Sequence, residues 1–140
     1  MRGLGADEPY WRALEAGRFE MQRCAGCDEW HWPAVWRCSA CSSWEQRWVP
    51  VPLVGAVFSW TRTWHDFGAA REHGLPFISV VVSLDAAAAR RVLGTLVHDS
   101  PAIQIGARVE GHIDRIDVDG RALPVLRWRL SSGEIEGRRS

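Results

Sequence analysis

The sequence predicts a mainly β protein in which a short N-terminal helix and a small metal-binding ribbon precede a five-stranded Greek-key barrel of the OB type. Two observations lead to this fold class. All four cysteines stand in two Cys-x-x-Cys pairs between residues 24 and 41, and five segments with the apolar patterns of β-strands follow between residues 54 and 130. A small open sandwich is the alternative arrangement of those strands. The expected units are an N-terminal arm and helix at 1–18, a zinc ribbon at 19–49, a barrel at 50–130 and a flexible tail at 131–140.

The first expected element is a helix from Glu8 to Ala16, with Asp7 as its N-cap and a glycine directly after its end. Tyr10, Trp11 and Leu14 give this helix an apolar face. A helix of about ten residues is not stable alone in water, so the face must dock on another surface. That surface belongs either to the same chain or to a partner subunit, and we take these three residues as candidate partner contacts.

The two cysteine pairs, Cys24 with Cys27 and Cys38 with Cys41, predict one tetrahedral site for a structural Zn²⁺ ion in each chain. Four thiolates close the coordination sphere, which leaves no position for a water or a substrate and argues against catalysis by the metal. The same spacing suits a thiolate-ligated iron site. A redox dithiol would explain one pair but not both, and disulfides would need an oxidising compartment. His31 lies between the pairs and could replace one thiolate.

Two strands, from Phe19 to Arg23 and from Glu45 to Val49, are expected to flank the cysteine pairs as a small antiparallel unit. The residue after each pair often adopts the left-handed conformation, and here Asp28 and Ser42 occupy those positions in place of glycine. A ribbon this small has little core, so we expect large rings to pack around the metal or to contact another surface. Five of the nine tryptophans lie in or beside this segment: Trp30, Trp32, Trp36, Trp44 and Trp48.

The second part of the chain has the apolar pattern and turn signals of an all-β domain. The expected strands are Val54 to Trp64, Phe77 to Leu84, Arg91 to His98, Arg108 to Asp117 and Leu123 to Leu130. The β-branched run from Phe77 to Leu84 predicts a strand buried on both faces. Four alanines in the following turn could form a helical turn, and Asp119-Gly120 is a strong signal for a hairpin.

Charge and motifs narrow the functional classes. The chain has 17 basic and 17 acidic residues, and its arginines are scattered among acids, which argues against nucleic-acid binding. We expect no targeting or membrane-spanning segment and a cytoplasmic protein. The sequence contains no P-loop, dinucleotide fingerprint or nucleophile elbow, and a zinc site would use every cysteine. A standalone enzyme is therefore disfavoured.

A longer pattern runs through these parts. It comprises Tyr10-Trp11-Arg12-Ala13-Leu14, Gly17, Gln22-Arg23-Cys24, Cys27, Pro33, Cys38, Cys41, Trp48, Gly55 to Ser59, Pro76 to Leu84 and Ile105-Gly106. With this pattern the chain resembles the family that joins a rubredoxin-like zinc ribbon to an acyl-CoA-associated OB fold, whose members accompany thiolase-like enzymes. The resemblance implies a non-catalytic subunit that binds a thiolase-like thiolase or sterol side-chain aldolase as a heterotetramer and helps to form the acyl-CoA path. A module that binds single-stranded nucleic acid is the alternative function.

The loop from His65 to Pro76 is the candidate segment for contact with the acyl-CoA. Loops on a rigid barrel often carry binding residues, and arginine and aromatic side chains suit the phosphates and adenine of coenzyme A. Phe67, Arg71 and His73 are the candidate substrate-binding residues on this loop.

Overall fold

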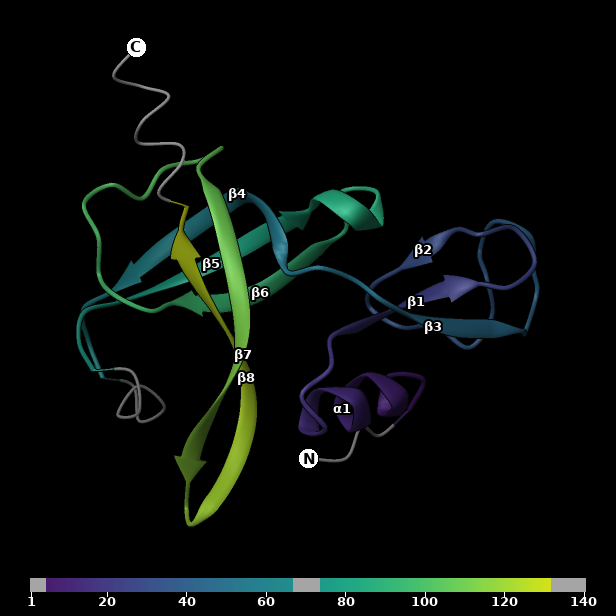
Figure 1. Ribbon diagram of the computed structural model, residues 1–140, viewed down its shortest axis with the longest axis horizontal. Helices are drawn as coiled ribbons and strands as arrows, with labels where there is room; N and C mark the ends of the chain where they lie inside the picture. The colour runs from purple at the N-terminus through teal and green to yellow at the C-terminus, as the bar shows by residue number, and fades with distance from the viewer. Residues whose placement is uncertain (1–4, 67–73, 132–140) are drawn as a thin grey trace.

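The computed structural model describes residues 5–66 and 74–131 of the chain. A short helix, a three-stranded sheet and a closed five-stranded barrel follow one another along the sequence (Figure 1). The predicted fold class is confirmed. Phe67, Arg71 and His73, and the tail beyond Ser131, lie outside the described residues. Within the described ranges, no helix has the length and apolar character needed to cross a bilayer.

The helix α1 spans Glu8–Glu15, close to the predicted range. Gly17 ends it with a φ of +82°, a conformation that glycine adopts without strain. Asp7 occupies the N-cap position, as predicted, but its carboxylate makes no capping hydrogen bond to the helix backbone. It accepts a hydrogen bond from the indole N–H of Trp11 instead, at 2.9 Å.

The ribbon is an antiparallel sheet with the strand order β2-β1-β3. Its strands are β1 (Glu20–Cys24), β2 (Trp30–His31) and β3 (Gln46–Pro50). The two longer strands match the prediction to within a residue. Sequence reasoning missed β2, since two residues are too few to show a periodic pattern.

The barrel closes in the order β4-β5-β6-β8-β7, with β7 returning to pair with β4. Its strands are β4 (Val54–Thr63), β5 (Phe77–Leu84), β6 (Arg91–Leu96), β7 (Arg108–Val118) and β8 (Arg121–Leu130). Among the described strands, β6 and β8 pair in parallel, and the other barrel neighbours are antiparallel. This is the five-stranded topology of an OB fold.

The turns between the strands follow the sequence signals. Asp85–Ala87 form the short 3₁₀ helix η1, and the next two alanines take left-handed conformations. Asp119 and Gly120 both have positive φ, +52° and +79°, as the turn of a two-residue hairpin requires. The expectation that β5 is buried on both faces is wrong. Its residues alternate between buried and half-buried, because one face lines the barrel interior and the other is only partly covered.

The helix packs between the ribbon and the barrel, against β1 and β8 (Figure 1). The ring of Tyr10 meets Trp32 at 4.3 Å and Phe19 at 6.0 Å between centroids. On the barrel side, the guanidinium of Arg115 donates to the carbonyl oxygen of Glu15. The apolar helix face thus docks on its own chain, and it joins the two domains.

Candidate metal centre and neighbouring surfaces

The four cysteine sulfurs converge at one end of the ribbon. All four Sγ atoms lie within 4.8 Å of one another, with 3.5 Å between Cys24 and Cys41 and 3.6 Å between Cys27 and Cys38. A tetrahedron with metal–sulfur bonds of about 2.3 Å has edges of about 3.8 Å. The cluster therefore has the size and the donor set for one tetrahedral ion that prefers thiolates.

The local backbone explains how each pair aims its sulfurs inward. Asp28 and Ser42 have φ values of +65° and +69°, so both take the left-handed conformation at the positions considered above. The N–H of Asp28 returns to the carbonyl of Cys24 at 3.0 Å, and the N–H of Ser42 returns to the carbonyl of Cys38 at 2.9 Å. Each pair therefore sits in a tight turn without needing a glycine after it.

Backbone dipoles and crowding both favour a bound cation. The backbone N–H groups of Cys27 and Gly26 point at the Cys24 sulfur and lower the pKa of that thiol to about 6. The Gly26 nitrogen lies 3.3 Å from this sulfur. One thiolate is thus stabilised without help, but four negative charges within 4.8 Å repel one another strongly. A divalent metal removes that repulsion.

His31 stands beside this cluster and not in it. Its imidazole is buried, and Nε2 lies 3.3 Å from the Cys38 sulfur. The cysteine sulfurs alone form the candidate ligand set in the described part of the chain. His31 therefore contacts a candidate ligand as a hydrogen-bond neighbour, a role that sequence reasoning did not assign to it. Such contacts orient metal ligands and tune their basicity.

The helix residues expected to contact a partner have different environments. Tyr10 and Leu14 are 4% and 1% exposed, so they fill the interior of this chain. Trp11 is half-buried and lines an apolar groove of about 350 Å³ between α1 and the barrel. Leu93 and Ile116 line the opposite wall of the groove. Of the three helix residues, Trp11 retains the most surface for a ligand or partner.

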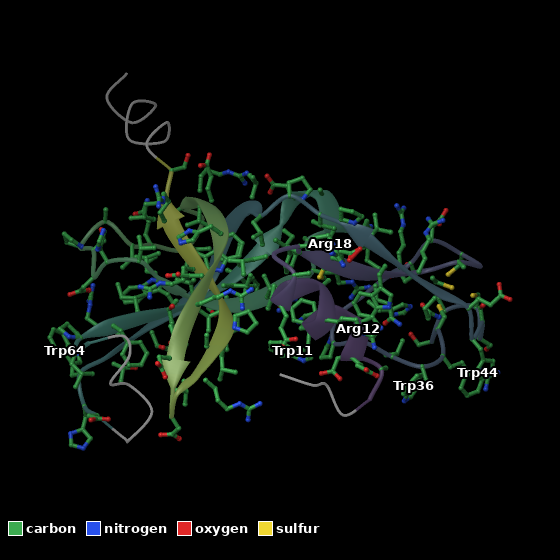
Figure 2. All side chains as sticks on the ribbon, turned by 60° about the horizontal axis from the view of Figure 1, so that its bottom comes forward. Trp11, Arg12, Arg18, Trp36, Trp44 and Trp64 are labelled. Atoms are coloured by element: carbon green, nitrogen blue, oxygen red, sulfur yellow. The ribbon has the colours of Figure 1, made fainter. Side chains whose placement is uncertain are left out.

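Three other tryptophans are mostly exposed: Trp36, Trp44 and Trp64. Figure 2 places the first two on the ribbon and the third at the far end of the barrel. Tryptophan is unusual in solvent, because its large ring gains more from burial than most side chains do. The sequence showed an excess of tryptophan around the metal site but not which rings are exposed.

The described residues show no catalytic constellation. The acid beside His98 in sequence, Asp99, binds Arg62 at 2.8 Å. On β7, His112 is half-buried and Asp114 is exposed, and the two side chains form no hydrogen bond with each other. Over residues 5–66 and 74–131, we find no nucleophile held by a base next to an oxyanion-binding pair of donors.

Both domains of the chain match models of known protein families. Residues 11–45 match the family model described as ChsH2, rubredoxin-like zinc ribbon domain, and residues 48–114 match that of ChsH2, C-terminal OB-fold domain. The two matches together span more than two thirds of the chain. Curated protein sequences provide no significant match.

Two solved structures resemble the fold. A chain of the Ltp2-ChsH2(DUF35) aldolase is 25% identical, with a TM-score of 0.76 over 92% of this chain and 98% of that one. A protein of unknown function from the DUF35 family of Sulfolobus solfataricus is 17% identical, with a TM-score of 0.61 over 93% of this chain and 87% of that one. The second likeness concerns the fold alone. The chain belongs to the ChsH2 family, in which a rubredoxin-like zinc ribbon is followed by a C-terminal OB-fold domain.

Proposed function

We propose that this chain is a non-catalytic subunit of an aldolase or thiolase complex, in which a thiolase-like partner performs the chemistry. The observation that carries the proposal is the likeness to a chain of the Ltp2-ChsH2 aldolase, which extends over both domains and nearly the whole of that chain. The lack of a catalytic constellation among the described residues supports a partner that supplies the active site. The expected assembly contains two copies of each subunit, since thiolase-like enzymes act as dimers in the family that the sequence resembles.

We propose that Cys24, Cys27, Cys38 and Cys41 hold one structural Zn²⁺ per chain. The support is the closeness of the four sulfurs and the zinc-ribbon match over the same segment. Zinc would supply folding energy here and no chemistry, because four thiolates leave no open coordination position. A ribbon held in this way keeps its shape on the surface of a partner.

We further propose that the barrel side of the chain helps to form the path of an acyl-CoA substrate in the complex. The groove beside Trp11 supports this role, because the exposed Leu93 and the half-buried Ile116 give it apolar walls. Its volume of about 350 Å³ lies at the lower end of the range for ligand sites. A groove of this size could cover part of an acyl group while the partner holds the rest.

Co-expression tests the central claim. The chain and a thiolase-like protein from the same genome are purified together and run on a sizing column, with zinc content measured on the same fractions. We expect one complex with equal amounts of both subunits, aldol or thiolytic activity in the complex, and no turnover by this chain alone. Independent elution at micromolar concentration would refute the proposal, as would thioester turnover by this chain when no thiolase is detectable by mass spectrometry.

A further inference from the structure

We infer that the ribbon carries the contact surface for the catalytic subunit, in the form of Trp36, Arg37 and Trp44. We call these three residues the indole patch. The inference rests on the proposed function, and it adds both the place of the contact and the chemistry of the partner surface. That surface should present apolar side chains around a carboxylate.

Exposure is the first observation. Trp36 is 66% exposed and Trp44 is 69% exposed, although both lie on a small domain whose other rings are largely packed. Figure 2 shows the two side chains on the same side of the ribbon, away from the barrel. They also line one groove of about 250 Å³, together with Trp48 and Gln46. The rings thus form one surface and not two isolated exposures.

The second observation is that hydrogen bonds within the ribbon hold the backbone that carries the patch. The buried side-chain amide of Gln22 both accepts from the N–H of Val35, at 2.8 Å, and donates to its carbonyl oxygen, at 2.7 Å. This pair of bonds fixes the backbone directly before Trp36. The guanidinium of Arg37 donates to the carbonyl of Ser42 at 3.0 Å and lies over the ring of Trp44. The backbone of the patch therefore loses less conformational entropy on binding than a loose loop would, which favours association.

The third observation is unused charge. The guanidinium of Arg37 donates to a backbone carbonyl but forms no ion pair with any carboxylate of the described residues. A carboxylate from a partner would pair with it.

The size of the patch suits a protein partner. Two indoles exposed to this extent offer on the order of 300 Å² of mainly apolar surface. A stable interface buries about 800 Å² on each side, so the two rings alone would supply more than a third of it. Tryptophan and arginine are also the residues that most often dominate the free energy of binding at interfaces.

The proposed function identifies the occupant, and charge argues against a nucleic acid. Phosphates would meet Glu8 on the groove wall and Glu45 beside Trp44, and both carboxylates repel them. A second copy of this chain would bring the same carboxylates towards Arg37, so self-association is an outcome that the test must separate. The likeness to a subunit of an aldolase complex favours the catalytic subunit, with one carboxylate opposite Arg37 and apolar side chains opposite the two rings.

Single substitutions in the zinc-loaded chain test the inference. Trp36→Ala and Trp44→Ala are compared with Trp64→Ala, a matched control that removes a ring of similar exposure, 70%, from the far end of the barrel. Affinity for the purified catalytic subunit is measured by calorimetry. We expect each ribbon variant to raise the Kd at least about 25-fold and the control to change it less than about threefold. Zinc content and thermal unfolding should match the wild type in all three, since the rings are exposed.

A charge reversal tests the chemistry of the partner surface. At low salt, Arg37→Glu should raise the Kd more than Trp36→Ala or Trp44→Ala does. Arg121→Glu at the hairpin tip should not have this effect. The inference is overturned if the wild type binds and both ribbon variants bind within threefold of it, an outcome that leaves the proposed function intact. It is also overturned if sedimentation shows that the chain alone dimerises through these rings. A wild-type chain that binds no thiolase-like partner defeats the proposed function and this inference together.

Discussion

Adding a single methyl group at Gly94 should measurably destabilise the barrel, because the ring of Trp128 occupies the space. A Cβ atom at this position would lie 2.5 Å from Nε1 of the indole and 2.8 Å from the backbone oxygen of Leu126. Ordinary contacts begin at about 3.4 Å, so the ring would have to move by roughly 0.9 Å. The ring of Trp128 is fully buried and has no room to move away. Its six-membered edge packs against Gly111, where an added Cβ would lie 2.8 Å from the ring.

The expected magnitude follows from two opposing effects. Overpacking of a filled core costs about 1 to 3 kcal/mol, whereas replacing a glycine with alanine returns about 0.4 to 1 kcal/mol through the unfolded chain. The net loss for Gly94→Ala should be about 1 to 2 kcal/mol, or a fall in Tm of about 3 to 8 °C for a chain of this size. Urea unfolding followed by circular dichroism measures it. Gly5→Ala is the control, because its Cβ would have no neighbour within 4 Å.

A double-mutant cycle assigns the effect to the ring. The indole N–H of Trp128 has no hydrogen-bond partner among the described residues, so Trp128→Phe shortens the ring without breaking a bond. Gly94→Ala should then cost at least about 0.5 kcal/mol less in the Trp128→Phe background than in the wild type. An equal cost in both backgrounds, or a Gly94→Ala protein as stable as the wild type, would refute the packing argument.

Three further outcomes test the ribbon and the surface. Cys38→Ser should reduce bound zinc well below one per chain and unfold the ribbon, as measured by metal analysis and proteolysis; full zinc occupancy in this variant would contradict the four-sulfur site. Gln22→Leu should cost about 2 to 3 kcal/mol, because both of its hydrogen bonds to Val35 are lost within a buried site, and urea unfolding would show a smaller loss if water replaced them. The hydrogen bond from Arg108 lowers the pKa of the Asp85 carboxyl. The pair therefore stabilises the fold fully at a pH above the ordinary pKa of aspartate. This stabilisation is lost as the pH falls through the lowered pKa. Asp85→Asn should thus cost well under about 1 kcal/mol, the value for an exposed pair, at pH 7, and this cost should shrink as the pH falls below the ordinary pKa of aspartate; a cost that does not shrink in acid would contradict this.

The sequence by itself determined the parts of the fold that depend on local chemistry. The cysteine spacing predicted the ribbon, alternation and β-branched runs predicted the five barrel strands, and Asp119-Gly120 predicted its hairpin. These signals work because a turn or a strand constrains residues that are close together in the chain. Sequence reasoning missed the two-residue strand β2, because this strand forms only through pairing with β1 and has no local signal.

Only the tertiary structure decided which side chains face solvent. Tyr10 and Trp11 are neighbours on one apolar helix, yet the first is buried against the ribbon and the second borders a groove. Among the ribbon tryptophans, Trp30 is buried, whereas Trp36 and Trp44 are exposed. Composition and spacing in the sequence do not distinguish the buried rings from the exposed ones. Their exposure depends on which distant elements pack over them, and that is settled by contacts between segments far apart in the sequence.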